Sequence, residues 1–168
     1  MKTMFTLILL VSLANLSVDK PGGLYINITM IVTSHSKDST STKTSFTIVD
    51  DKVVYDETYS GFRASRRVPV HNEYKFTQQE VANLERIIQQ KNLLRSRSFA
   101  DPAEIAPPYI SYELTEEIKW QGKHSLIKVS GSTKSLDPDE KKNNRLYQDA
   151  DALFEYVRTT VDLKGESQ

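Results

Sequence analysis

The residue types best suited to specific recognition gather in one short stretch, residues 59–67. Around a central glycine it carries two aromatic residues and three arginines, namely Tyr59, Phe62, Arg63, Arg66 and Arg67. Arginine binds carboxylate or phosphate groups through two parallel hydrogen bonds, and aromatic rings supply contact area with little loss of side-chain entropy. The stretch is therefore typical of a binding hot spot. Its alternative interpretation is a charged edge strand that is protected against sheet-to-sheet aggregation.

Two further arginines, Arg95 and Arg97, open a connection over residues 95–108 that contains three prolines. Connections of this length are uncommon in compact domains, and those that are ordered often bind ligands. If this connection folds over the edge formed by residues 64–70, its two arginines extend the same basic surface. We therefore add both arginines to the candidate binding residues.

No catalytic or metal-binding motif accompanies these residues. The three histidines, His35, His71 and His124, lack the local spacing of a metal-binding pair, and neither a His-Glu-x-x-His nor a Gly-x-Ser-x-Gly motif occurs. The absence of cysteine excludes disulfides, thiolate zinc sites, iron–sulfur clusters and cysteine catalysis. We predict no catalytic residue, no metal site and no cofactor. The alternative is a hydrolase that uses His71 or His124 with a nearby carboxylate.

The charges of the chain are balanced, with 22 Lys and Arg against 22 Asp and Glu. A chain without net charge has no strong overall field, so its composition does not indicate nucleic acid or an anionic membrane as a partner. The acidic pair Asp50–Asp51 lies in a predicted turn, and the pair Glu116–Glu117 alternates between the faces of a predicted strand. We interpret both pairs as solvated charges and not as an acid/base site.

The N-terminus has the layout of a secretory signal peptide. Lys2 precedes an apolar run over residues 4–13, and the small residues Ser12 and Ala14 suit cleavage after residue 14 or as late as residue 17. The run is shorter than the roughly 20 residues of a membrane span, so we predict no transmembrane helix. A buried first strand or a short core helix is the alternative. An exported domain without disulfides favours a bacterial periplasmic or secreted protein, since small extracellular animal domains usually carry them.

Alternating hydrophobicity predicts that much of the remaining chain is sheet. A period of two predicts six strands, at residues 24–33, 44–49, 53–59, 64–70, 109–120 and 124–130. Residues 34–43 contain no apolar side chain and are expected to form a polar loop. In the fifth strand, Glu116 interrupts an otherwise apolar face. Trp120, beside a turn at residues 121–122, either caps the sheet or anchors a partner.

Two helices are predicted from helical spacing and from helix-start signals. A capping box that begins at Thr77 precedes a helix over residues 78–91, and a second start signal precedes a helix over about residues 139–162. The order ββββαββα favours an α+β fold, with an antiparallel sheet of about six strands and both helices packed on one face. We expect a single domain over residues 22–163 and a flexible tail over residues 164–168.

A familiar pattern runs through residues 76–161. It consists of a capped helix that ends with residues 88–94, the segments Tyr112-x-Leu114 and Gly122-Lys123-His124, and a final amphipathic helix. In these features the chain resembles emfourin-like proteins, which are small bacterial inhibitors of metalloproteases, and related exported bacterial domains without an assigned function. The resemblance implies a protease inhibitor as an alternative function and transfers no site residue.

Together these features predict an exported bacterial domain that binds a protein or a peptide and catalyses no reaction. The candidate binding residues are Tyr59, Phe62, Arg63, Arg66, Arg67, Arg95 and Arg97. A protease inhibitor and a hydrolase are the two alternatives.

Overall fold

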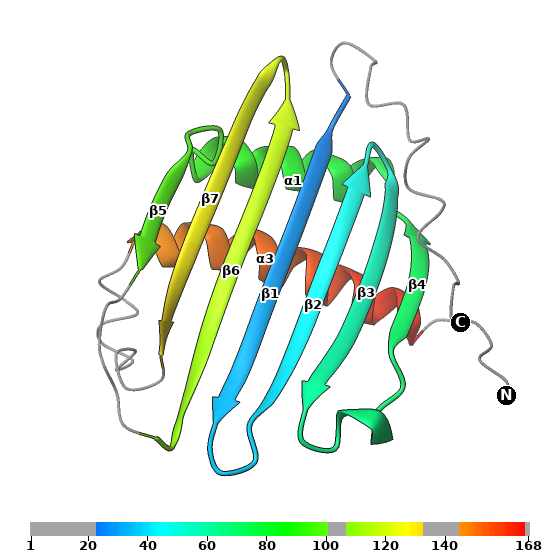
Figure 1. Ribbon diagram of the computed structural model, residues 1–168. Helices are drawn as coiled ribbons and strands as arrows, with labels where there is room; N and C mark the ends of the chain where they lie inside the picture. Colours follow the sequence, from blue (N-terminus) through cyan, green and yellow to red (C-terminus); the bar gives the residue numbers. More distant parts are fainter. Residues whose placement is uncertain (1–22, 101–106, 133–144, 167–168) are drawn as a thin grey trace, which may run out of the picture.

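In the part of the chain that the structure describes, a seven-stranded sheet carries two α-helices on one of its faces (Figure 1). The computed structural model describes residues 23–100, 107–132 and 145–166. The strands are β1 (Tyr25–His35), β2 (Thr40–Val49), β3 (Lys52–Gly61), β4 (Val70–Lys75), β5 (Arg97–Ala100), β6 (Tyr109–Trp120) and β7 (Lys123–Ser132). The helices are α1 (Gln78–Gln90), α3 (Arg145–Gly165) and the short 3-10 helix η2 (Ala64–Arg66). The predicted signal peptide at residues 1–14 and the predicted start of the last helix at residues 139–144 lie outside these residues.

The strands lie side by side in the order β4-β3-β2-β1-β6-β7-β5. All neighbours are antiparallel except β5, which runs parallel to β7 and lies within the predicted connection over residues 95–108. The predicted α+β class is confirmed. The sheet is mixed, however, and it has seven strands where about six antiparallel ones were expected.

The core lies between the sheet and the helices because one face of each central strand is apolar. In β1, Ile26 and Ile28 point to this side, and their partners in β2 are Ile48 and Phe46. The buried apolar residues of α3 are Tyr147, Ala150, Leu153, Phe154, Val157 and Val161. These residues of α3 belong to the same hydrophobic core as the apolar face of the strands.

Both predicted hairpin turns are confirmed, at residues 50–51 and 121–122. Asp50, Gln121 and Gly122 have φ angles of 55°, 51° and 72°, in the left-handed region that tight two-residue hairpin turns require. Trp120, next to the second turn, is only 6% exposed. The tryptophan therefore caps this end of the sheet and is not an exposed anchor.

Helix α1 begins at the predicted capping box and ends in a left-handed cap. The backbone N–H of Glu80 donates a hydrogen bond to the Thr77 hydroxyl at 3.2 Å, and the Thr77 N–H donates to the Glu80 carboxylate at 2.6 Å. Beyond the last turn, Asn92 has a φ of 53°, and the Leu93 N–H donates to the Ile88 carbonyl at 2.9 Å. The capping box and the left-handed C-terminal cap satisfy backbone groups that a helix end leaves without partners.

Helix α3 continues to Gly165, beyond the predicted end at residue 162. Lys164, which was expected in a flexible tail, forms an ion pair with Glu80 at 3.0 Å. This contact joins the last turn of α3 to the first turn of α1. Neither of these helices is long and apolar enough to cross a membrane.

The predicted strand over residues 64–70 is wrong. Its place is taken by η2, and the edge strand β4 begins only at Val70. Pro69 has no N–H group to donate to a strand ladder, so pairing starts after it. Arg63 has a φ of 60°, which turns the chain away from an extended path before η2.

The predicted polar loop over residues 34–43 is also shorter than expected. β1 extends to His35 and β2 begins at Thr40, because polar side chains on strands can face water without disturbing the backbone ladder. Hydroxyl groups pair across these strand ends, as when Thr33 donates to Ser41 at 3.1 Å.

Candidate functional site

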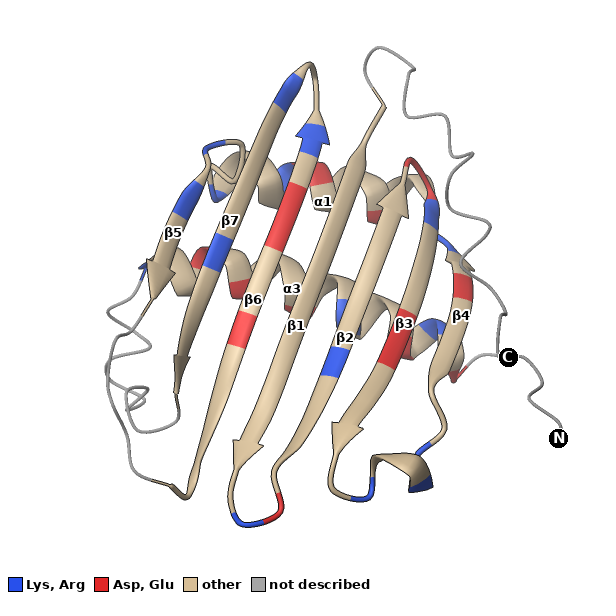
Figure 2. Cartoon of the chain, in the orientation of Figure 1, with Lys and Arg blue, Asp and Glu red and all other residues tan. Residues whose placement is uncertain are grey.

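A pocket of about 500 Å³ lies where β3 passes into η2, beside the turn between β1 and β2. Its lining residues are Asp38, Thr40, Ser41, Tyr59, Ser60, Phe62, Arg63, Ala64, Arg66 and Arg67. Five of the seven predicted binding residues are among them, and we name the site the arginine pocket. In Figure 2 the blue segments between β3 and β4 mark its basic residues, at the lower end of the sheet.

A tight turn after β3 shapes the pocket. Gly61 has a φ of 90°, and a Cβ atom at this position would lie 2.3 Å from the carbonyl oxygen of Ser39. The Phe62 N–H donates a hydrogen bond to the same oxygen at 2.9 Å. Only glycine tolerates this conformation and this close approach without strain. The turn therefore holds the β3–β4 connection against the β1–β2 turn and brings their side chains into one pocket.

The three arginines of the pocket form no ion pair with a carboxylate within residues 23–100, 107–132 and 145–166. The guanidinium carbon of Arg63 lies 4.9 Å from the Phe62 ring centroid, and that of Arg67 lies 5.0 Å from the Tyr59 ring centroid. Stacking on a ring leaves the N–H donors of the guanidinium group available to a ligand. Asp38 is the one acidic residue among the lining residues, against three arginines. The pocket therefore favours an anionic group, and carboxylate and phosphate match the arginine fork.

Glu57 holds the Tyr59 ring in place. The Tyr59 hydroxyl donates a hydrogen bond to the Glu57 carboxylate, which also accepts from Tyr55 at 3.0 Å and from Thr44 at 3.4 Å. The hydrogen bond to Glu57 raises the pKa of Tyr59 above its ordinary value of 10.0, so the phenol stays neutral near pH 7. The ring beneath the Arg67 guanidinium is thus fixed by a carboxylate that does not itself line the pocket.

The expected extension of this basic surface by Arg95 and Arg97 is wrong. β4 and β5 lie at opposite edges of the sheet, so Arg97 in β5 is far from the arginine pocket (Figure 1). Arg97 donates a hydrogen bond to the Lys91 carbonyl at 3.2 Å, and its guanidinium lies 3.8 Å from the Asp149 carboxylate. It therefore joins β5 to the end of α1 and to α3. Arg95 is exposed ahead of β5 and does not line the pocket.

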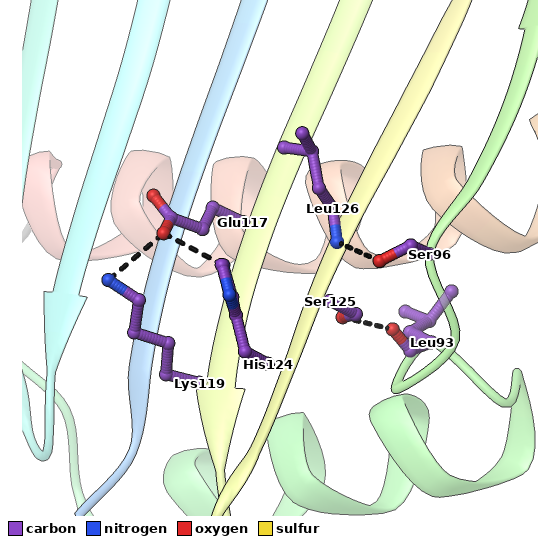
Figure 3. Close-up of polar contacts among 7 residues, drawn as sticks. All are labelled: Leu93, Ser96, Glu117, Lys119, His124, Ser125 and Leu126. Carbon is purple, nitrogen blue, oxygen red and sulfur yellow. Dashed lines mark hydrogen bonds and ion pairs between the residues drawn. The ribbon is translucent and has the colours of Figure 1, made fainter.

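The three histidines lie on the sheet face opposite the helices. His71 lies 2.6 Å from the Asp56 carboxylate, and this hydrogen bond raises the pKa of His71 above its ordinary value of 6.5. His124 lies 3.0 Å from the Glu117 carboxylate, which also pairs with Lys119 at 3.0 Å (Figure 3). The side chains of these two histidines are 64% and 59% exposed. Both have the carboxylate neighbour that the hydrolase alternative requires, but neither lines the arginine pocket.

A hydrolytic triad needs a hydroxyl, a histidine and a carboxylate in one chain of hydrogen bonds. Among the described residues, the hydrogen bonds of His35 include the Ser111 hydroxyl at 2.8 Å and no carboxylate. Those of His71 and His124 include a carboxylate and no hydroxyl in the same part of the chain. The three chemical groups are therefore not assembled at any of these histidines.

The prediction that Glu116 is a solvated charge is wrong. Its side chain is 0% exposed, and neither carboxyl oxygen has a hydrogen-bond partner among the described residues. Burial raises the pKa of this carboxyl well above its ordinary value, Asp151 adds to the rise, and Arg97 opposes it. Glu116 lies two residues from both Leu114 and Ile118, so it is on the same, apolar face of β6. The alternation that predicts this apolar face therefore also indicates the burial of Glu116.

Comparison with known proteins places the chain in no family. No protein-family model and no curated protein sequence matches it. The resemblance of residues 76–161 to emfourin-like proteins therefore stays a prediction. Within the described ranges, no group of three His, Asp or Glu side chains is placed to hold a metal ion.

Proposed function

We propose that this protein is an exported bacterial domain that binds a protein or peptide partner through the arginine pocket and catalyses no reaction. The observation that carries the proposal is the convergence of Arg63, Arg66 and Arg67 in one pocket without an ion pair among the described residues. Guanidinium groups without an internal carboxylate have donors available for an external one. Export and bacterial origin rest on the N-terminal sequence pattern and on the absence of cysteine.

The surroundings of the arginines suit a macromolecular partner. Phe62 is 47% exposed, and Val68, which follows the pocket residues in sequence, is 82% exposed. Exposed apolar side chains beside arginines are typical of interface anchors. Two of the guanidinium groups already lie over aromatic rings, which reduces the side-chain entropy that is lost when a partner binds.

Replacing Arg63, Arg66 and Arg67 together with alanine tests the proposal. All three side chains are exposed, so the variant should keep the fold and the thermal stability of the parent protein. A charge-assisted hydrogen bond contributes about 1.5–3 kcal/mol, so the loss of these donors should weaken partner capture at least about tenfold. The measurement is a quantitative pull-down of partners from an extract of the source bacterium.

The matched control replaces Arg95, Lys123 and Lys128 with alanine. This variant removes the same number of positive charges from exposed positions outside the pocket. It should capture the partner as well as the parent protein does. Unchanged capture by the pocket variant, or an equal loss in both variants, would show that the pocket is not the binding site.

The inhibitor alternative is supported by the pattern over residues 76–161, and it has a direct assay. Purified protein is added to a panel of metalloproteases from the same organism, and their activity is measured. Inhibition that the pocket variant loses would identify a protease as the partner, whereas a panel without any inhibition would count against this alternative. For the hydrolase alternative, the described residues provide two histidine–carboxylate pairs but no assembled triad, so we do not propose it.

A further inference from the structure

One edge of the sheet is formed by β4, and in the described part of the chain no strand pairs with its outer side (Figure 1). Its pairing with β3 determines which backbone groups face outward. The Phe76 N–H donates to the Asp51 carbonyl at 2.7 Å, so these opposite residues form a hydrogen-bonded pair. Such pairs alternate along an antiparallel ladder, and therefore Tyr74, Asn72 and Val70 also bond to β3.

The backbone groups of the other β4 residues, His71, Glu73 and Lys75, consequently point away from the sheet. Each of the three presents one N–H and one C=O group at the edge. All three residues are exposed, so an approaching chain would meet these groups directly. An edge of this kind is a template to which an extended peptide can add as a further strand.

The β4 edge leads into the arginine pocket. Arg67 lines the pocket, and only Val68 and Pro69 separate it from the first residue of β4. Extended chain covers about 3.3 Å per residue, so a strand bound along β4 needs only about three further residues to reach Arg67. A single peptide segment can therefore bond to the edge and enter the pocket.

The positive charge of the arginine pocket determines which chemical groups the peptide places there. Three arginines face one acidic residue, Asp38, so the part of the peptide that enters the pocket must supply anionic groups. In an antiparallel arrangement, the C-terminal end of the added strand lies at Val70. The carboxylates should then follow the β-forming part of the peptide. A phosphate group would also match the arginines, but it has no backbone to pair with β4.

We infer that the partner is an extended peptide segment that adds an eighth strand at β4 and places acidic side chains at its C-terminal end in the arginine pocket. The inference rests on the proposed function and adds the class of partner and its mode of binding. The exposed Val68 and Phe62 would contact apolar parts of the same segment.

Synthetic peptides with blocked ends test the inference. The probe alternates Thr and Val and ends in a run of Glu, and the matched peptide ends in the same number of Gln residues. Affinity for the full protein is measured by calorimetry, and amide hydrogen exchange is followed by NMR. We expect the Glu peptide to bind at least about tenfold more tightly and to slow exchange at His71, Glu73 and Lys75.

A pair of variants at one position separates edge pairing from pocket binding. Glu73→Pro removes an outward N–H group, whereas the N–H groups that bond to β3 belong to neighbouring residues. Glu73→Thr removes the same charge but keeps the N–H group. We expect the proline variant to bind the Glu peptide about tenfold more weakly than the threonine variant. Hydrogen exchange on the unmodified protein decides the question if the proline variant does not fold.

The other possible results of these experiments distinguish a failure of strand addition at β4 from a failure of the proposed function. If binding depends on the three arginines but exchange at the β4 edge does not change, strand addition is wrong and the proposed function stands. If binding of the Glu peptide is unaffected by the arginine-to-alanine variant, both are wrong. Absence of binding by the Glu peptide, or tighter binding of inorganic phosphate than of the Glu peptide, would also overturn the peptide assignment.

Discussion

Replacing the buried Glu116 with methionine should stabilise the protein, although it removes a charged residue type from a β-strand. The carboxyl group is fully buried, and neither oxygen has a hydrogen-bond partner among the described residues. Its partners on the two adjacent strands are both apolar, Ile28 in β1 and Ile127 in β7. Methionine is similar in length, has no polar group to desolvate and adapts to irregular core spaces.

The expected gain in stability follows from the free-energy cost of burying a polar group without a hydrogen-bond partner. This cost is about 1–3 kcal/mol in mutational data. We expect Glu116→Met to raise the free energy of unfolding by about this amount at pH 7. For a chain of this size, that corresponds to a rise in Tm of about 2–4 °C per kcal/mol. Denaturant unfolding monitored by circular dichroism measures the change. The control is Glu113→Met on the exposed face of the same strand, which should change stability by less than about 0.5 kcal/mol.

The pH dependence gives a second, independent readout of the same group. Burial raises the pKa of Glu116 in the folded state above its ordinary value of 4.5. The folded state therefore binds this proton more tightly, and the associated stability is present below about pH 4.5 and is lost as the pH rises through the raised pKa. The advantage of Glu116→Met over the parent should accordingly be smaller at pH 4 than at pH 8. A variant that is less stable than the parent by more than about 1 kcal/mol, or an advantage independent of pH, would refute this reasoning.

Three further predictions concern the turn, a helix cap and a histidine. Gly61→Ala should lower the free energy of unfolding by more than about 1 kcal/mol in denaturant titrations, because the new Cβ would collide with the Ser39 carbonyl at a positive φ. Thr77→Ala should cost about 1 kcal/mol in the same assay, since it removes the acceptor of the helix cap. Asp56→Asn should return the pKa of His71 towards 6.5 in an NMR titration. The stability linked to this pair is present below pH 6.5 and is lost as the pH rises through the raised pKa, so the variant should lack this dependence. An unchanged His71 pKa would exclude Asp56 as its cause.

Local patterns in the sequence predict most of the strands and the start of helix α1. Alternation over residues 24–33 predicts β1, and the capping box at Thr77 predicts the start of α1, because each signal depends on residues that are neighbours in the chain. The clustering of Tyr59, Phe62 and three arginines is likewise visible in nine consecutive residues. The strand predicted over residues 64–70 is wrong because Pro69 and the left-handed residues Gly61 and Arg63 redirect the chain.

The sequence by itself determined the α+β class, the hairpin turns and the residues that supply the positive charge of the pocket. Only the tertiary structure decided that Arg97 lies at the far edge of the sheet, that the Glu116 carboxyl has no hydrogen-bond partner among the described residues, and that the β1–β2 turn completes the pocket. Hydrophobic periodicity reports which face of an element is covered, but it does not report which strands become neighbours. Strand order depends on contacts between residues that are distant in sequence, and those contacts form the arginine pocket and leave the edge of β4 exposed.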